Sequence, residues 1–480
     1  MAQGVKNNVS ERLSSVARME CMEISGRVSG VSGLIVEVRE FAVPVGAQCH
    51  ILTRQDDVVL AEVIGFREDL SLLIPLSPGT GIAGGDLVLC KQVRATVPVS
   101  ENLLGRVING FGEPIDGKGP LLCQLRQSID PERLEPLQRE RIKEVIGTGI
   151  RSIDALMTCG RGQRMGIFSG PGVGKSVLLG TIARYTTADI SIIALVGERG
   201  REVREFIEKD LGPEGLSRSV VVVSTSEEPP PLRVRASHMA ATLAEYFRRM
   251  GRDVLLLMDS ITRVAMAQRQ IGLALGEPPA TKGYTPSVFA LLPAMVERCG
   301  ISSHGSITGF YTVLVEGDDV SEPISDAMRG LLDGHLWLSR DLANRNHYPA
   351  IDTVESVSRV MTDIVDEQHL QNSQDITRLI AIYRDIEDLV NIGAYAAGSN
   401  PEHDLAVQSN TVICNFLRQG MHEGIGYSQA VSQLQELVSQ IKLVAQQNAA
   451  TVTESNTGDN LQTSSNDPRP LGLERMMAGV

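Results

Sequence analysis

The chain has 480 residues, and at roughly 150 residues per domain this length suggests about three domains. Hydrophobic residues make up 42% and charged residues 21%, which excludes intrinsic disorder for most of the chain. The 45 Lys and Arg residues against 58 Asp and Glu residues give a net charge of -13, which argues against general binding to nucleic acid or anionic membranes.

Localisation is indicated by the cysteines and by the absence of long apolar runs. The seven cysteines are scattered and never spaced as C-x-x-C, so they signal neither a disulfide framework nor a zinc site. No apolar run approaches the ~18 residues of a membrane span, and the N-terminus lacks the apolar core of a signal peptide. We therefore expect a soluble protein in a reducing cytoplasm.

The first hundred residues divide into a short helix and a β-rich unit. In residues 1–19, Val9, Leu13 and Val16 form an apolar stripe, which predicts either a helix that docks on a partner or a loose terminus. In residues 20–99, short apolar runs alternate with Gly and Pro clusters, which predicts a small β-barrel of about five or six strands.

Residues 100–365 have an α/β pattern, in which apolar strands alternate with helical stretches. The runs that predict these strands are Arg164–Phe168, Ile190–Val196, Val220–Val223, Val254–Met258 and Phe310–Val315. Continuous apolar strands between helices imply a mostly parallel sheet covered on both faces, with ligands at the carboxyl ends of the strands.

The last part of the chain is predicted to be helical and then disordered. After Val365 the apolar residues follow a helical period, which predicts a C-terminal helical domain over residues 366–445. Residues 446–470 are mainly polar and contain no aromatic residue, and we extend the predicted tail to residue 480. Because such a segment cannot bury enough surface to offset its ordering entropy, we predict a disordered tail.

A phosphate-binding motif follows the first strand of the α/β region. The segment Ser169–Ser176, Ser-Gly-Pro-Gly-Val-Gly-Lys-Ser, lies between a strand and a helical run, which is the context that a P-loop requires. Glycines let backbone N–H groups face the phosphates, Lys175 reaches the terminal phosphates and Ser176 holds Mg²⁺. The strict pattern has Gly at position 169, and a small residue there still lets the backbone approach phosphate. We expect ATP to bind at Gly170, Gly172, Val173, Gly174, Lys175, Ser176 and Val177.

Two acidic residues follow other predicted strands. Asp259 ends an apolar strand, where a P-loop enzyme needs a carboxylate for the Mg²⁺ water shell, although an acid in this position is more often a helix cap. Glu198 follows the strand 190–196 and could polarise an attacking water molecule. The alternative is a solvated loop in which Glu198 pairs with Arg199.

Taken together, these segments resemble the ATPases of the bacterial flagellar type III protein-export apparatus, which are homologous to the catalytic subunits of rotary ATP synthases. The resemblance extends from about residue 20 to about residue 443. Its most specific pieces are Leu104–Val107, Gly112–Gly117, Cys159–Arg164, Gly197–Glu202, Leu314–Asp319 and Pro349–Arg359.

The resemblance implies a Mg²⁺-dependent ATPase and assigns roles to the acidic and P-loop residues. Lys175 and Ser176 match positions that bind phosphate and Mg²⁺. Asp259 matches a position that serves the metal. Glu198 matches the glutamate that activates water, which favours this role over the solvated loop.

Further residues are assigned by the same resemblance. Arg199 and Arg263 match positions that contact phosphate, and Tyr348 matches the tyrosine that stacks on adenine. Arg359 matches the arginine finger that enters the neighbouring subunit's site.

The resemblance also implies an assembly and its partners. Because Glu198 and Arg359 lie on one chain, we expect a homo-oligomeric ring, in particular a hexamer. Implied partners are a regulator on the N-terminal helix, a central coiled-coil stalk, and export substrates with their chaperones, but no nucleic acid. The loop Gly317–Glu322 matches the region that faces the stalk, and its alternative is a surface turn. The resemblance also implies a cytoplasmic location with peripheral association at the inner-membrane export gate.

Four other functions remain open. A virulence-type type III secretion ATPase would share the fold and the chemistry, and a rotary ATP synthase catalytic subunit would share the fold. A ring-shaped nucleic-acid motor needs aromatic residues on its first domain, whereas residues 20–99 contain only Phe41 and Phe66 as aromatics. A non-catalytic nucleotide-binding scaffold would release no phosphate.

Overall fold

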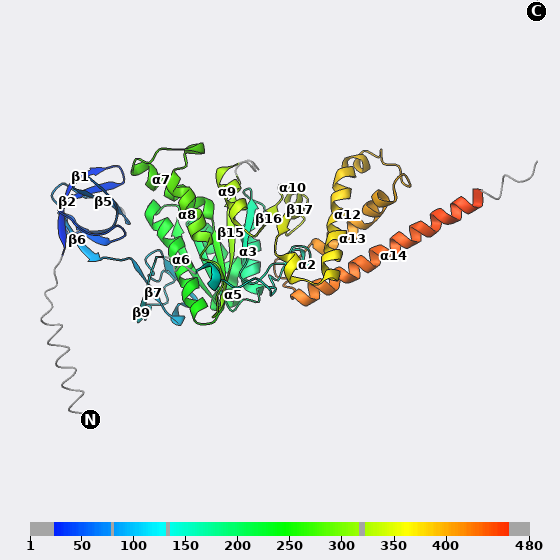
Figure 1. Cartoon of the computed structure of the whole chain (residues 1–480), viewed down its shortest axis with the longest axis horizontal. Helices are drawn as coiled ribbons and strands as arrows, with labels where there is room; N and C mark the ends of the chain where they lie inside the picture. The colour runs from blue at the N-terminus through cyan, green and yellow to red at the C-terminus, as the bar shows by residue number, and fades with distance from the viewer. Residues whose placement is uncertain (1–23, 78–80, 131–134, 316–321, 460–480) are drawn as a thin grey trace, which may run out of the picture.

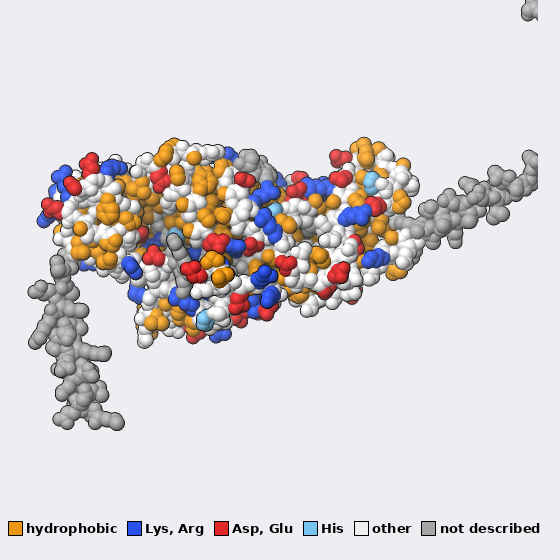
Figure 2. Space-filling model, in the orientation of Figure 1, with side chains coloured by type: hydrophobic (Ala, Val, Ile, Leu, Met, Phe, Trp, Pro, Cys, Tyr) orange, Lys and Arg blue, Asp and Glu red, His pale blue; other side chains and the backbone are white. Residues whose placement is uncertain are grey.

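The computed structural model describes residues 24–77, 81–130, 135–315 and 322–459. Figure 1 shows a β-barrel at one end, a sheet with helices in the middle and a helical region at the other end. Figure 2 shows basic and acidic side chains interspersed over one face of the molecule. Within the described ranges, no helix is both long enough and apolar enough to cross a bilayer. The expected helix over residues 1–19 lies outside these ranges, as does most of the loop Gly317–Glu322.

The N-terminal strands close into a barrel in the order β1-β2-β5-β4-β3-β6. Its strands are β1 (Ser25–Ser32), β2 (Ile35–Arg39), β3 (Gln48–Leu52), β4 (Val58–Arg67), β5 (Leu70–Pro75) and β6 (Leu87–Gln92). Alternate residues of β3, Cys49 and Ile51, point into a closed apolar core, as the period of two in a strand requires. Pairing of β1 with β6 leaves no open sheet edge. The predicted small barrel is confirmed.

The central sheet has the order β17-β16-β10-β15-β13-β11-β12-β8, with β14 paired to β15. Its strands are β8 (Arg106–Asn109), β10 (Arg164–Ser169), β11 (Ile190–Glu198), β12 (Ser219–Thr225), β13 (Asp253–Asp259), β14 (Gly300–Ile301), β15 (Ser306–Leu314), β16 (Gly334–Leu338) and β17 (Ile351–Ser358). Among the described strands of this sheet, only the pairs β16–β17 and β14–β15 are antiparallel, so the mostly parallel sheet is confirmed. The strands β8, β16 and β17 were not predicted, because they are short or partly polar.

Both faces of the central sheet are covered. On β11, Ile192 and Ala194 join one apolar cluster, whereas Ile193 and Leu195 join another. The first cluster includes residues of α6 (Pro230–Arg249), α7 (Ile261–Ala274) and α8 (Pro286–Val296), and the second includes residues of α3 (Lys175–Tyr185). Because side chains alternate along a strand, one fully apolar strand supplies both layers.

The C-terminal region is helical, as predicted. It consists of α12 (Glu367–Asn391), α13 (Pro401–Leu417) and α14 (Tyr427–Asp459), whose buried side chains pack with α2 (Arg151–Leu156) and α3. Helix α14 continues past residue 446, where we predicted the disordered tail to begin, so that boundary is corrected. A helix that has already formed can extend without burying a core, and this one does so through a mainly polar segment.

Shorter elements connect these units. They are β7 (Thr96–Val99), η1 (Glu101–Leu103), β9 (Leu125–Ser128), η2 (Pro136–Gln138), α4 (Gly200–Glu205), the π-helical turn η3 (Phe206–Leu211), α5 (Gly212–Ser217), η4 (Thr281–Gly283), α9 (Pro323–Leu331), α10 (Arg340–Asn344) and α11 (Met361–Ile364). Strands β7 and β9 pair with each other near α6 of the central region.

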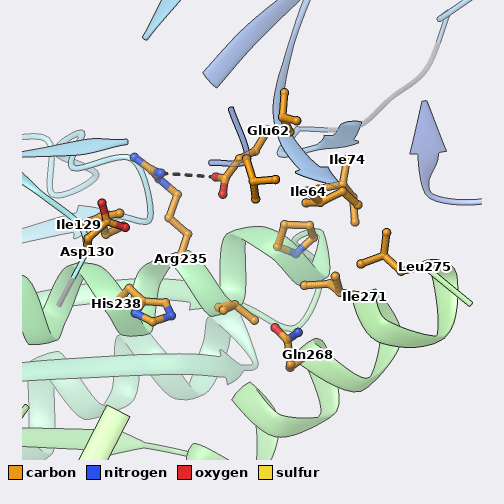
Figure 3. Close-up of a pocket in the computed structure, with 14 residues that line it drawn as sticks. Glu62, Ile64, Ile74, Ile129, Asp130, Arg235, His238, Gln268, Ile271 and Leu275 are labelled. Carbon is orange, nitrogen blue, oxygen red and sulfur yellow. Dashed lines mark ion pairs between the residues drawn. The ribbon is translucent and has the colours of Figure 1, made fainter. Parts of the chain in front are cut away.

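A cavity of about 300 Å³ lies where the barrel meets the central region (Figure 3). The barrel contributes Glu62 and Ile74, and helices α6 and α7 contribute Arg235 and Ile271. Glu62 and Arg235 form an ion pair of 3.7 Å across the junction. Arg235 is only 6% exposed, so this pair ties the barrel to the central region within a mostly apolar lining.

Candidate nucleotide site

The phosphate loop is a tight connection between β10 and α3. Gly172 and Gly174 have φ values of 77° and 88°, which are left-handed conformations that favour glycine. Gly174 directly precedes the first residue of α3, Lys175. The N–H groups of the first helical turn have no intrahelical partner, so this loop is built to receive an anion.

Three charged side chains meet beside the loop, at the carboxyl ends of neighbouring parallel strands. Lys175 Nζ donates to Asp259 Oδ1 and lies 3.5 Å from Glu198 Oε1. Asp259 ends β13 and Glu198 ends β11. Thr312 Oγ1 on β15 donates to Asp259 Oδ1 at 2.7 Å, which fixes that carboxylate.

Burial and charge have opposite effects in this cluster. Burial raises the pKa of the Glu198 carboxyl, although the nearby Lys175 ammonium acts in the other direction. Burial opposes the charge on Lys175, but Asp259 and Glu198 outweigh it and raise the pKa of the ammonium. A carboxyl with a raised pKa next to a charged lysine is typical of a group that exchanges protons.

Arg263 connects the cluster to the backbone that carries Glu198. Its Nε lies 3.4 Å from Glu198 Oε1, and its Nη1 donates to the carbonyl of Gly197. Gly197 has φ 73°, and a Cβ there would lie 2.7 Å from Arg263 Cδ, so only glycine allows this approach. Ser260 caps α7 by accepting from the Arg263 N–H at 3.3 Å.

An apolar cavity of about 470 Å³ adjoins the phosphate loop. Tyr348 forms one wall, together with Pro349 and Leu338. A Cβ on Gly174 would lie 3.3 Å from the Tyr348 ring, so the ring sits directly against the loop. An exposed aromatic wall beside a phosphate site suits a planar base.

The segment after α13 closes this cavity, and sequence reasoning missed it. Gln419, Gly420 and Met421 line the cavity. The Gln419 N–H donates to the Tyr348 carbonyl at 2.9 Å, and its Nε2 donates to the Gly149 carbonyl at 2.7 Å. No local motif marks these residues, because their role depends on contacts with distant parts of the chain.

Three family models match the chain. They are the ATP synthase alpha/beta family β-barrel domain over residues 28–91, the nucleotide-binding domain of the same family over residues 149–358, and the T3SS EscN ATPase C-terminal domain over residues 365–436. The matches therefore follow the barrel, the central sheet and the C-terminal helices in turn.

Whole-chain relatives are more specific. The flagellum-specific ATP synthase of Bacillus subtilis is 49% identical over 429 residues, which cover 87% of this chain and 98% of the relative. The chain belongs to the family of flagellum-specific ATP synthases and type III secretion ATPases. The type 3 secretion system ATPase of Xanthomonas euvesicatoria is 48% identical over 395 residues, which cover 82% of this chain and 89% of that relative.

Solved structures of type III ATPases share the fold. The assembled ATPase EscN of enteropathogenic E. coli has a TM-score of 0.80 and 41% identity, and the match covers 86% of this chain and 100% of EscN. The same values apply to EscN in complex with its central stalk EscO.

In this type III ATPase, most of the predicted site residues lie together. Lys175, Glu198, Asp259, Arg263 and Tyr348 surround the loop and its cavity. Ser176 and Val177 are exposed in the first turn of α3. The alternative pairing of Glu198 with Arg199 does not occur, because Arg199 is 75% exposed and lies 3.5 Å from Glu202.

Arg359 lies away from the phosphate loop of its own chain. It directly follows Ser358, which pairs with Gly334, and Gly334 pairs with Met165 near the start of β10. The loop begins at the other end of β10, about 13 Å further along at ~3.3 Å per residue. Arg359 is therefore at the amino ends of the parallel strands, opposite the ends that carry the phosphate loop.

Proposed function

We propose that this ATPase hydrolyses ATP as a homo-oligomeric ring, expected to be a hexamer, that serves the export of flagellar proteins. The observation that carries the proposal is that the catalytic groups are divided between the two ends of the parallel strands. The carboxyl ends carry Lys175, Glu198 and Asp259, and the amino ends carry Arg359. A ring of identical chains would bring the two sets together at each interface.

The loop and its neighbours would bind the nucleotide. Backbone N–H groups and Lys175 would hold the phosphates, and Tyr348 would stack on adenine. Ser176 and Asp259 would hold Mg²⁺, which suits their oxygen donors, since Asp259 is already oriented by a hydroxyl and Ser176 is open to solvent. When bound, Mg²⁺ neutralises charge on the phosphate oxygens.

Hydrolysis would then depend on two protein groups. Glu198 would orient the attacking water and accept its proton, a role that its raised pKa supports. Arg263 would keep Glu198 in place and, with Arg199, contact phosphate. Arg359 of the neighbouring subunit would neutralise charge that develops in the transition state.

The partners follow from the family. EscN is known as an assembled ATPase and in complex with its central stalk EscO, and by analogy we propose a ring and a coiled-coil stalk for this chain. We further propose a regulator on the helix 1–19, binding of export substrates and chaperones, and a cytoplasmic location at the inner-membrane export gate. Removing residues 1–19 should release the regulator and leave hydrolysis competent.

A virulence secretion system is the second candidate, and the 48% identity to the Xanthomonas euvesicatoria secretion ATPase favours keeping it. Complementation separates the two. The chain should restore motility to a bacterium that lacks its own flagellum-specific ATP synthase. Restored secretion of virulence proteins without restored motility would instead identify an injection system.

The ring is tested by phosphate release over a range of protein concentrations, with the oligomer measured by mass in the same samples. Activity per chain should rise as rings assemble, because a lone chain lacks its finger. Full activity of a monomer would contradict the proposal.

A further inference from the structure

We propose that Arg329 is a second arginine that the chain presents, beside Arg359, to the triphosphate held by the neighbouring subunit. The inference rests on the proposed function, since it requires Arg359 to act across an interface between two copies of the chain.

Arg329 and Arg359 are in direct contact. Arg329 lies in the last turn of α9, shortly before β16 begins at Gly334. Arg359 Nη2 donates to the carbonyl of Arg329 at 3.3 Å, and the Arg359 N–H donates to the Asp333 carbonyl at 2.9 Å. Both residues are thus held near the amino ends of the parallel strands, whereas their own phosphate loop is at the carboxyl ends.

Neither guanidinium has an acidic partner among the residues that the structure describes, since no ion pair within 4.0 Å involves Arg329 or Arg359. Burial lowers the pKa of the nearby His335 imidazole, and Arg329 and Arg359 lower it further, whereas Glu355 acts in the other direction.

Three acidic residues line the same cavity as Arg329: Asp352 and Glu355 are engaged by Arg384, and the charge of Asp341 acts on Arg345. Arg384 lines the same cavity of about 360 Å³ as Arg329, and it pairs with Asp352 at 3.3 Å and with Glu355 at 3.5 Å. Asp333 is held by Arg164 at 2.8 Å. Figure 2 shows a group of basic side chains on the face where Figure 1 draws β16.

Two guanidiniums that both act on His335 and have no carboxylate partner are suited to an anion with many oxygens. A triphosphate offers several acceptors in the geometry that arginine prefers. In a ring, the anion nearest to Arg359 would be the nucleotide of the next subunit. The chain's net charge of -13 disfavours a nucleic-acid backbone as the ligand.

The first test compares single variants in assembled rings. Arg329→Gln should lower kcat/KM for ATP roughly 10- to 100-fold, the worth of one hydrogen bond to a charged group. Arg329→Lys should recover part of this loss. Arg384→Gln is the matched control from the same cavity and should change kcat/KM less than about twofold, because its exposed pairs contribute little. If Arg384→Gln lowers kcat/KM as much as Arg329→Gln does, the cavity has only a structural role and the proposed role of Arg329 is wrong.

The second test asks whether Arg329 acts in trans. Glu198→Gln and Arg329→Gln chains are mixed and co-assembled. An interface that joins the Arg329→Gln phosphate loop to an intact Arg329 on the Glu198→Gln chain is complete, so kcat/KM per active site should return towards the wild-type value. The same mixture made with Arg359→Ala is the reference.

The outcomes separate the two proposals. Recovery in both mixtures supports Arg329 in trans. Recovery with Arg359→Ala alone would overturn the role of Arg329 and leave the proposed function standing. Failure of both mixtures would overturn the finger assignment, and the role of Arg329 with it.

Discussion

The nucleotide site and the barrel junction both place an ion pair between neighbouring elements, yet they differ in what surrounds it. At the nucleotide site, Lys175 faces two carboxylates beside a glycine loop and an apolar cavity of about 470 Å³. At the junction, Glu62 meets one arginine within a mostly apolar lining. The nucleotide site differs from the junction because the backbone N–H groups of its glycine loop are also free to bind an anion.

Removing the lysine of the phosphate loop should have the largest effect on ATP turnover of any change in the two regions. Lys175→Ala should lower ATP turnover by roughly 10³-fold or more, because the charge next to the terminal phosphates is lost. Phosphate release by the purified, folded variant, checked by circular dichroism, measures this. Turnover near the wild-type value would contradict the P-loop assignment.

Glu198→Gln should separate binding from chemistry at the same site. The amide fills the same volume but cannot accept a proton, so turnover should fall roughly 10²- to 10³-fold while affinity for a fluorescent ATP analogue stays near that of the wild type. If binding falls as much as turnover, Glu198 has a structural role.

The raised pKa of Glu198 also predicts a pH profile. A base must be deprotonated to act, so kcat/KM should fall about tenfold per pH unit below its pKa, with the acid limb above the ordinary value of 4.5. The profile of Glu198→Asp, which keeps a carboxylate, should show a limb, whereas that of Glu198→Gln should lose it. An acid limb that persists in Glu198→Gln would assign it to another group.

Breaking the junction should affect stability rather than rate. Arg235→Met should reduce the free energy of unfolding by about 2 kcal/mol, less than for a fully buried pair because the Glu62 side chain is 27% exposed. Glu62→Gln is the matched control that removes the same pair from the barrel side. Denaturant unfolding and turnover well below the melting temperature measure both effects, and a tenfold loss of turnover would show that the junction is part of the site.

The same two regions show how far the sequence predicts the structure. The loop was predictable because a short motif between a strand and a helix depends on local backbone geometry. Asp259 and Glu198 could be placed at strand ends, but the sequence alone left other roles open for both, and the family resemblance favoured Glu198 as the group that activates water. The ion pair of Glu62 with Arg235 and the closing role of Gln419 were not, since both depend on contacts between segments far apart in the chain. The end of α14 was misjudged because a helix that has already formed can extend without a buried core of its own.

The central claim is that each catalytic site takes groups from two copies of this chain. Rings of Glu198→Gln and rings of Arg359→Ala should each be nearly inactive. When the two proteins are mixed and shown by mass to co-assemble, some interfaces combine an intact Glu198 with an intact Arg359. Phosphate release should then rise well above the sum of the two separate proteins, and only at concentrations where rings form. No recovery at any ratio in co-assembled rings would contradict the claim.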